Sequence, residues 1–430
     1  MAAISIIGNG YVGLVIAAGF ASKGHNIVCI DANETKTKQI NEGKSPIYEA
    51  GLNSLLSSCV NEKVNLKASS DYNEILESDV TFICVNTPPR PFQKIDISHI
   101  IDSAIEIGHV LARKSNYHVV AVKSTVIPGT TEGIIAPTLE RYSSKKAGRD
   151  FGISVNPEFL QEGRAIHSFL NPDRIIIGEY DRRAGDLLEE LYHDYSAPII
   201  RTNMRAAEMI KYASNAFLAT KISFINEIGN ICKKLGIDIC EVAKGMGYDP
   251  RIGNQFLDAG IGFGGSCLPK DLEALIFKAG ELGYKAELLQ SVSKVNKEQP
   301  LRLVEIAKTR LGTLENKEVT VLGLAFKPNT DDIRQAPALK ITAQLLVEGA
   351  TVRVYDPKAM TGAKQVLPDG VEFCDSAPDA IAGSDAVLIA SEWDEFTDES
   401  LYAGKLVIDG RRVLDPQKVN AICDYQGICW

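Results

Sequence analysis

The stretch ISIIGNGYVG, residues 4–13, decides the fold of the first part of the chain. Its apolar start predicts a buried strand, and the glycine-rich turn that follows leads into an apolar helix through Ala21. Further along the chain, apolar strand-like runs alternate with amphipathic helical stretches. These runs lie at residues 26–30, 80–85, 119–122, 153–155 and 175–178. Such alternation predicts a parallel sheet covered by helices.

The three glycines of this turn have the GxGxxG spacing of a dinucleotide site. Gly8 permits a tight turn, Gly10 lets the backbone approach a pyrophosphate, and Gly13 lets helix and strand pack closely. Asp31 ends the next strand, 18 residues beyond Gly13, and its carboxylate suits a ribose 2'-hydroxyl while repelling a 2'-phosphate. The pattern therefore predicts NAD rather than NADP as cofactor, although Lys36 nearby weakens this exclusion.

The pattern changes after residue 203. Residues 204–234 and 281–311 are each expected to form a long helix, and strand-like runs return at residues 319–322, 351–355, 386–390 and 406–408. The predicted fold is α/β: an N-terminal Rossmann domain, a central helical domain with a long helix, and a C-terminal Rossmann-like domain. We expect these domains to span residues 1–200, 201–300 and 301–430.

Composition excludes several classes of function. The 430 residues are 45% hydrophobic and 23% charged, with a net charge of -9, and no basic stripe suits nucleic acid. The apolar N-terminus lacks a basic signal-peptide region, and no apolar stretch is long enough to span a membrane. Nine cysteines without a CxxC pair predict reduced thiols in the cytoplasm, with neither a disulfide framework nor a metal site.

The loop GFGGSCLPKD, residues 262–271, carries the most informative cysteine. Pro269 fits the first turn of a helix, which would place Cys267 at the helix N-terminus. That position and the charge of Lys270 favour the nucleophilic thiolate. Asp271, one turn further on, could act as a base or hold water. The alternative is a buried structural cysteine, the usual fate of this residue type.

Three other groups have weaker signals. Glu158 and Glu162 follow a strand, where sheet-end loops form ligand crevices, but they equally suit a solvated first helical turn. Lys211 and Asn215 lie one helical turn apart and could donate jointly to an oxyanion, or could simply form a solvated face. Thr125, in the run Lys123-Ser124-Thr125, could hold a water or cap a turn.

Taken together, the motifs resemble the UDP-glucose/GDP-mannose dehydrogenase family over essentially the whole chain. The matching stretches are GNGYVG from Gly8, SPIYEAGL from Ser45, NPEFLQEG from Asn156, FLNPDRIIIG from Phe169, GFGGSCLPKD from Gly262 and GLAFKPNTDDIR from Gly323. Several motifs in one order are more specific than any single one.

The resemblance implies two NAD-dependent hydride transfers from C6 of a nucleotide sugar, UDP-glucose above all, through a thiohemiacetal and a thioester on Cys267. It also implies a homodimer, or a higher homo-oligomer, built on the central helices. The catalytic residues implied are Cys267, Asp271, Lys211, Asn215, Glu158 and Thr125. The implied NAD contacts are Gly8, Gly10, Tyr11, Val12, Gly13, Asp31, Lys36, Thr87, Thr125, Glu162 and Arg334. The implied substrate contacts are Glu158, Phe159, Leu160, Glu162, Lys211, Asn215, Arg251, Phe263, Gly264 and Lys327.

Alternatives remain open at this stage. GDP-mannose is the main competing substrate, because its oxidation uses the same kind of cysteine loop, but SPIYEAGL and FLNPDRIIIG resemble the UDP-glucose branch more closely. UDP-N-acetylmannosamine is disfavoured, since the cysteine loop of that branch typically reads GGHCIPVD. An ordinary two-electron dehydrogenase would need no thiol, and a non-enzymatic regulatory subunit would tolerate loss of the catalytic set.

Overall fold

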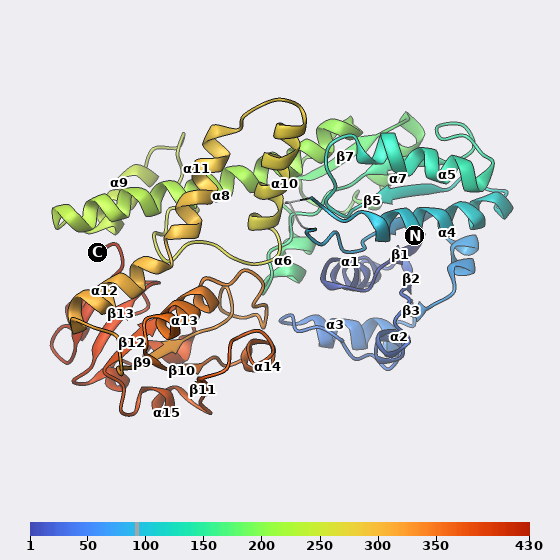
Figure 1. The fold of residues 1–430 in the computed structure, drawn as a ribbon. Coiled ribbons are helices and arrows are strands. Elements are labelled where there is room, and N and C mark those ends of the chain that lie inside the picture. Colours follow the sequence, from blue (N-terminus) through green and yellow to red (C-terminus); the bar gives the residue numbers. More distant parts are fainter. Residues whose placement is uncertain (91–93) are drawn as a thin grey trace. The chain divides into compact units, whose positions relative to one another are not determined.

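The computed structural model describes residues 1–90 and 94–430, which form two compact units, Met1–Ser214 and Asn215–Trp430 (Figure 1). The boundary falls within one continuous helix, α8 (Met204–Leu235). Each unit contains a sheet covered by helices, so the predicted α/β class is confirmed. The division into three domains at residues 200 and 300 stays a prediction.

The first unit contains an eight-stranded sheet in the order β3-β2-β1-β4-β5-β6-β7-β8. Its first six positions follow the strand order of a dinucleotide-binding Rossmann fold. The strands are β1 (Ala3–Ile7), β2 (Asn26–Ile30), β3 (Leu66–Ser69), β4 (Val80–Ile83), β5 (Val119–Val122), β6 (Gly152–Val155), β7 (Ile175–Glu179) and β8 (Ile199–Asn203). The helices are α1 (Tyr11–Ser22), α2 (Glu34–Asn41), α3 (Leu52–Ser57), α4 (Ser98–Arg113), α5 (Ala136–Ser143), α6 (Ala165–Leu170) and α7 (Arg182–Leu191), with short turns η1 (Ser58–Glu62), η2 (Tyr72–Glu77) and η4 (Thr131–Ile135).

Side chains alternate between the two faces of this sheet, and helices pack on both faces and bury them. On β1, Ile4 and Ile6 pack into the core that contains α1 and α7, whereas Ile7 packs into the core that contains α4 and α5. The central strands are therefore apolar on both sides, as expected for a parallel sheet between helical layers.

One pair of strands departs from the predicted parallel arrangement. β6 and β7 are antiparallel, with Val155 opposite Gly178. After β6 the chain forms a loop and the six-residue helix α6, which packs against α1. β7 then starts at the same end of the sheet where β6 ended, which makes the two strands antiparallel.

The second unit contains a six-stranded parallel sheet in the order β11-β10-β9-β12-β13-β14. The strands are β9 (Glu318–Leu322), β10 (Thr351–Tyr355), β11 (Val371–Phe373), β12 (Ala386–Ile389), β13 (Leu406–Asp409) and β14 (Asp424–Gly427). The helices are α9 (Ile239–Gly247), α10 (Leu268–Glu281), α11 (Glu287–Glu298), α12 (Leu301–Leu311), α13 (Pro337–Val347), α14 (Met360–Ala363), α15 (Ala377–Ile381) and α16 (Pro416–Val419), with the turns η5 (Asp394–Thr397) and η6 (Glu399–Tyr402).

The single long helix expected over residues 281–311 is also wrong. The chain instead forms the end of α10, then α11 and α12. Gly283, at φ +75°, turns the chain after α10, and Pro300 separates α11 from α12, since proline lacks the N–H of a helix interior. The long helix expected over residues 204–234 is confirmed as α8. Within residues 1–90 and 94–430, no helix is both long enough and apolar enough to cross a membrane.

Candidate active site

The glycine-rich turn joins β1 to α1 as the sequence predicts. Gly8 lies at φ +93° and donates its N–H to the main-chain oxygen of Ile30 at 2.8 Å. A Cβ on Gly13 would lie 1.9 Å from the main-chain oxygen of Gly8, so only glycine allows the turn and α1 to meet. Gly8 and Gly13 are therefore required by the protein's own backbone.

Gly10 is different, because the protein itself leaves space beside it. A Cβ on Gly10 would meet only Asn86 Oδ1, at 3.6 Å, and its φ of -80° suits any residue. The neighbouring Asn9 side chain is fully buried, yet its amide has no hydrogen-bond partner among the described residues. Open space and an unsatisfied buried amide at the N-terminus of α1 fit a bound pyrophosphate.

Asp31 lies at the end of β2, where a ribose would be recognised. Its Oδ2 accepts from the Asn9 N–H at 2.7 Å, and its Oδ1 accepts from the Asn33 N–H at 2.9 Å. Each carboxylate oxygen can accept a further hydrogen bond, so these contacts orient Asp31 and still leave it able to bind a ligand hydroxyl. Asn33 caps the N-terminus of α2, because its Oδ1 accepts a hydrogen bond from the Lys36 N–H.

Glu49, from the SPIYEAGL motif, ties the turn to the segment after Glu162. The Tyr11 hydroxyl donates to Glu49, which also accepts from the N–H groups of Gly163 and Ala165 at 2.7 Å each. Burial and this carboxylate raise the pKa of Tyr11. Sequence reasoning quoted the motif but gave Glu49 no role.

Glu158 follows β6 and forms a buried ion pair with Lys211 of α8. Lys211 Nζ lies 3.0 Å from Glu158 Oε1, and the side chains are only 6% and 8% exposed. Burial by itself raises the pKa of Glu158, but Lys211, the Leu160 N–H and Lys123 outweigh it, so the net pKa is below the usual value. The carboxylate is therefore held in its ionised, proton-accepting form. This arrangement contradicts the alternative of a solvated helical turn for Glu158.

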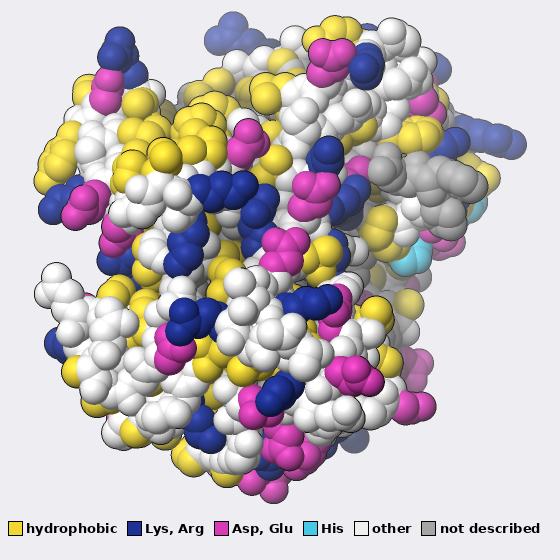
Figure 2. Space-filling view, turned by 60° about the vertical axis from the view of Figure 1, so that its left-hand side comes forward, with side chains coloured by type: hydrophobic (Ala, Val, Ile, Leu, Met, Phe, Trp, Pro, Cys, Tyr) yellow, Lys and Arg dark blue, Asp and Glu magenta, His cyan; other side chains and the backbone are white. Residues whose placement is uncertain are grey.

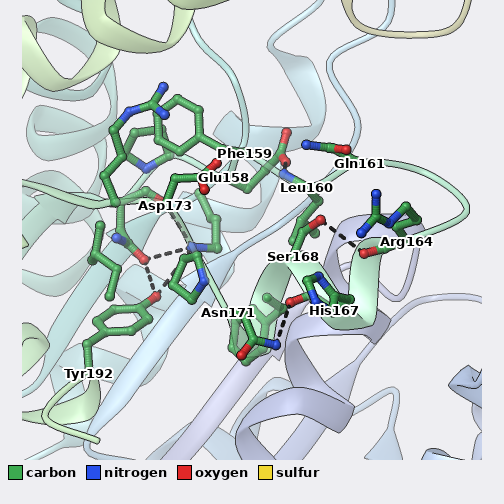
Figure 3. Close-up of a pocket in the computed structure, with 17 residues that line it drawn as sticks. Glu158, Phe159, Leu160, Gln161, Arg164, His167, Ser168, Asn171, Asp173 and Tyr192 are labelled. Carbon is green, nitrogen blue, oxygen red and sulfur yellow. Dashed lines mark hydrogen bonds between the residues drawn. The ribbon is translucent and has the colours of Figure 1, made fainter. Parts of the chain in front are cut away.

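A pocket of about 200 Å³ opens beside this ion pair (Figure 3). Glu158, Phe159 and Leu160 line it from the loop after β6, and Arg174 and Tyr192 line it from other segments. The Arg174 guanidinium lies 4.0 Å from the centre of the Phe159 ring, and Lys211 Nζ lies 5.3 Å from the same centre. The pocket thus has the Phe159 ring and the Arg174 guanidinium in its wall, together with the carboxylates of Glu158 and Asp173, which suits a polar ligand that carries a flat or apolar group.

The second unit holds the cysteine loop. Cys267 is exposed and occupies the N-cap position of α10, with Pro269 in the first turn, as the sequence predicts. Asp271 is 1% exposed and accepts from Asn215 Nδ2 at 2.6 Å and from Lys270 Nζ at 2.7 Å. The charge of Lys270 is thus directed at Asp271, and the thiol stands at the exposed helix end, which contradicts the alternative of a buried structural cysteine.

The rest of this loop is held by main-chain contacts. Phe263 exchanges two hydrogen bonds with the Asn296 side chain, at 2.8 and 3.0 Å, and the Gly265 N–H donates to the Arg334 main-chain oxygen at 2.8 Å. A Cβ on Gly264 would lie 2.5 Å from the Gln335 oxygen. The loop therefore packs tightly on the segment that carries Arg334.

The structure groups some predicted residues and leaves others apart. Thr87 Oγ1 donates to the Thr125 main-chain oxygen at 3.1 Å, which brings these two together. Arg251 and Arg334 are exposed and pair with Asp249 and Asp332. Sequence reasoning assigned no role to Arg174, although it lies in the quoted motif FLNPDRIIIG, or to Tyr192, for which no local pattern gave a signal. The remaining predicted contacts, Val12, Glu162 and Lys327, are half-buried.

A Rossmann turn followed by a carboxylate held by hydrogen bonds, together with an exposed thiol at a helix N-terminus, is typical of a dinucleotide-dependent dehydrogenase. Residues 2–196, 205–298 and 320–416 match the NAD binding, central and UDP binding domains of one family model set. The chain belongs to the UDP-glucose/GDP-mannose dehydrogenase family, and the cofactor of its first domain is NAD. The resemblance noted from the motifs is thereby confirmed.

Individual members of this family are similar to the chain over nearly their full length. The UDP-glucose 6-dehydrogenase AglM of Haloferax volcanii is 44% identical over 96% of this chain and 97% of its own. A GDP-mannose 6-dehydrogenase of Pseudomonas aeruginosa is 37% identical over 99% of this chain and 100% of its own. The solved structure of a UDP-glucose dehydrogenase from Pyrobaculum islandicum has a TM-score of 0.95 at 41% identity, covering 100% of this chain and 98% of that one.

Proposed function

We propose that this protein is a UDP-glucose 6-dehydrogenase, which oxidises C6 of the sugar to a carboxylate with two molecules of NAD. The observation that carries the proposal is the exposed Cys267 thiol at the N-cap of α10, in a chain of this family. In a dehydrogenase, a nucleophilic thiol of this kind can capture an aldehyde as a covalent adduct that is then oxidised again. The greater similarity to UDP-glucose enzymes than to a GDP-mannose enzyme favours a uracil nucleotide.

In the first oxidation, C6 loses a hydride, and the C6 hydroxyl gives its proton to Asp271, directly or through a water molecule that Asp271 holds. NAD, when bound, supplies the hydride acceptor for this step and for the second oxidation. Lys211 and Asn215, one turn apart on α8, donate to the developing alkoxide, and Asp271 orients the Asn215 amide through the 2.6 Å bond. These residues lower the barrier by stabilising charge that forms in the transition state.

The second half of the reaction uses the thiol. Cys267 Sγ bonds to the aldehyde carbon to give a thiohemiacetal, and loss of a proton and a hydride then yields a thioester. Glu158, held ionised by Lys211, accepts a proton from the water that attacks the thioester carbonyl, with Thr125 positioning this water. The C–S bond breaks, the thiolate is regenerated, and the carboxylate product leaves.

Binding is assigned to the remaining residues. For NAD we propose Gly8, Gly10, Tyr11, Val12, Gly13, Asp31, Lys36, Thr87, Glu162 and Arg334. For the nucleotide sugar we propose Phe159, Leu160, Arg251, Phe263, Gly264 and Lys327. The aromatic and cationic wall formed by Phe159, Arg174 and Lys211 supports this choice for the first unit.

A homodimer built on α8 is part of the proposal. Phe217, Phe224, Ile231 and Leu235 are all exposed on this helix, at spacings of seven, seven and four residues, which places them on one face. Figure 2 shows hydrophobic side chains gathered in the upper left of the view. An exposed apolar face of this kind on a single helix favours association with a second copy. We also propose that the protein is cytoplasmic, since all nine cysteines, which lie within the described residues, are thiols rather than halves of disulfides.

The deciding experiment measures NADH formed per sugar consumed, with UDP-glucose, GDP-mannose and UDP-N-acetylmannosamine compared. Two NADH per UDP-glucose, together with loss of acid formation in Cys267→Ser, is expected. Two NADH from another sugar would move the substrate assignment. One NADH with Cys267→Ser at full turnover would indicate an ordinary two-electron dehydrogenase, and no NADH from any sugar would indicate a regulatory subunit.

A further inference from the structure

Lys123 is a buried cation with no role in the mechanism above. It directly follows β5, in the run Lys123-Ser124-Thr125, and is 5% exposed. Its ammonium donates to Asn156 Oδ1 at 2.8 Å, to the Asn156 main-chain oxygen at 3.2 Å and to the Tyr192 hydroxyl at 3.4 Å. The rings of Phe82 and Tyr192 lie 5.7 and 6.0 Å from the same nitrogen. All three N–H donors are therefore used inside the protein.

These contacts fix the residue from which the Glu158 loop departs. Asn156 donates through Nδ2 to the Ile176 oxygen at 2.8 Å, and its Oδ1 also accepts from the Tyr192 hydroxyl at 2.5 Å. The next residue, Pro157, has no N–H with which to anchor the chain. Tyr192 points towards the base of this loop (Figure 3). Lys123 thus holds both the side chain and the main chain of the residue two positions before Glu158.

Lys123 also adds positive charge beneath the Glu158 carboxylate. The charged and titratable groups around it are Cys84 after β4, Tyr192 after α7, Lys211 on α8 and Glu158 itself. Burial lowers the pKa of Lys123 to about 8, although Cys84 and Glu158 oppose this effect. In turn, Lys123 is one of the groups that lower the pKa of Glu158.

Burying an ammonium group costs free energy, because the charge is removed from water. Replacing a buried charge by an apolar side chain of similar volume is often neutral or stabilising, so packing alone does not account for a lysine at this position. The hydrogen bonds to Asn156 and the charge near Glu158 both point towards the same loop.

We infer that Lys123 is a positioning residue for the proposed thioester hydrolysis, because it fixes Asn156 and keeps the Glu158 carboxylate in place and ionised. This inference rests on the proposed function of Glu158. Without Lys123, the loop would lose its anchor, and Glu158 would be misplaced and, with a higher pKa, less completely ionised. Hydrolysis would slow, while binding of NAD through the separate glycine-rich turn would not change.

The test compares Lys123→Met, which removes both charge and hydrogen bonds, with Lys123→Gln, which keeps a hydrogen-bond donor but no charge. Lys114→Met is the matched control, because Lys114 is another buried lysine of the same unit that donates to main-chain oxygens, those of Ile75 and Leu76. With UDP-glucose and NAD, the measurements are kcat, KM for NAD, the fraction of Cys267 trapped as thioester by acid quench and mass spectrometry, and the pH dependence of kcat.

For Lys123→Met we expect kcat to fall by about 10- to 100-fold with KM for NAD within about twofold, and the thioester to accumulate. In both Lys123 variants the acid limb of the kcat profile should move to higher pH, since the Glu158 carboxylate loses a nearby positive charge. Lys114→Met should change neither the acid limb nor the thioester fraction. If Lys123→Met does not fold, Lys123→Gln decides through its pH profile and thioester fraction. An unmoved acid limb and no thioester in the variant that folds would overturn the inference.

Glu158→Gln separates this failure from failure of the proposed function. If Glu158→Gln accumulates thioester while the Lys123 variants do not, only the role of Lys123 is wrong. If Glu158→Gln hydrolyses the thioester normally, Glu158 is not the base, and the inference about Lys123 falls with it.

Discussion

Lys211 Nζ and Glu158 Oε1 lie 3.0 Å apart in a pair that is almost completely withdrawn from solvent. Removing one partner of such a pair leaves a buried charge without compensation. This relationship between α8 and the loop after β6 links stability to the chemistry of the site, since the same contact holds Glu158 ionised.

The first prediction concerns the stability of this pair. Lys211→Met should lower the free energy of unfolding by about 3–5 kcal/mol, and the double variant Lys211→Met, Glu158→Gln should recover part of the loss. Urea denaturation at neutral pH measures both. Lys67→Met, at the exposed pair with Glu74, is the control and should cost less than about 1 kcal/mol. Equal losses at the two pairs would show that burial does not matter here.

A second prediction concerns thiol reactivity. Of the nine cysteines, Cys267 is exposed, six are buried, and Cys240 and Cys423 are half-buried with their pKa raised by burial to about 11. Iodoacetamide at pH 7.5 should therefore alkylate Cys267 first, with loss of acid formation. Peptide mass spectrometry over time identifies the modified site. Faster labelling of Cys240 or Cys423 would contradict the assignment of Cys267 as the accessible nucleophile.

The glycine-rich turn gives a third prediction, in which two glycines behave differently. Gly10→Ala should leave the melting temperature unchanged but weaken NADH binding, because its Cβ would occupy space the protein leaves open. Gly13→Ala should lower both, because its Cβ would lie 1.9 Å from the Gly8 oxygen. Gly245→Ala, with nothing within 4 Å, is the control. NADH fluorescence titration and thermal melting test this, and full NADH affinity in Gly10→Ala would refute a close pyrophosphate approach.

A fourth prediction follows from His118, which is fully buried between Thr81 and the Ser78 main-chain oxygen. Burial, with the nearby Lys114, lowers the pKa of His118 from 6.5 to about 3. Between these pH values the unfolded chain binds a proton that the folded chain does not, so stability falls as pH falls, by at most about 1.4 kcal/mol per pH unit. His118→Gln should show a shallower loss of stability from pH 6.5 to 4, measured by urea denaturation. An unchanged slope would mean that other groups dominate.

The apolar face of α8 gives the fifth prediction. Phe224→Asp should convert the proposed dimer to monomer, because it places a charge in the middle of the row formed by Phe217, Phe224, Ile231 and Leu235. Light scattering after size-exclusion chromatography measures the mass. The exposed Tyr284→Asp, after α10, serves as a control and should leave the mass unchanged. An unaltered mass in Phe224→Asp would place the interface elsewhere.

The sequence by itself determined the features that depend on neighbours along the chain. The turn from β1 to α1, strand β2, helix α8 and the position of Cys267 at the start of α10 all follow from local periodicity, glycine spacing and a proline. These signals act over one or two helical turns, so they can be read without knowing the fold. Residues 281–311 are the exception, because Gly283 and Pro300 interrupt a segment whose periodicity predicts one helix.

Only the tertiary structure decided which distant residues meet. Glu158 contacts Lys211, 53 positions away in the sequence, and Lys123 contacts Asn156, 33 positions away. β6 pairs with β7 in an antiparallel sense. The periodicity of the chain is the same whether a strand runs up or down the sheet, and a buried lysine looks like a solvated one in the sequence. The physical reason is that ionisation and hydrogen bonding at this site depend on burial and on partners from other strands and helices, which exist only after the sheet has assembled.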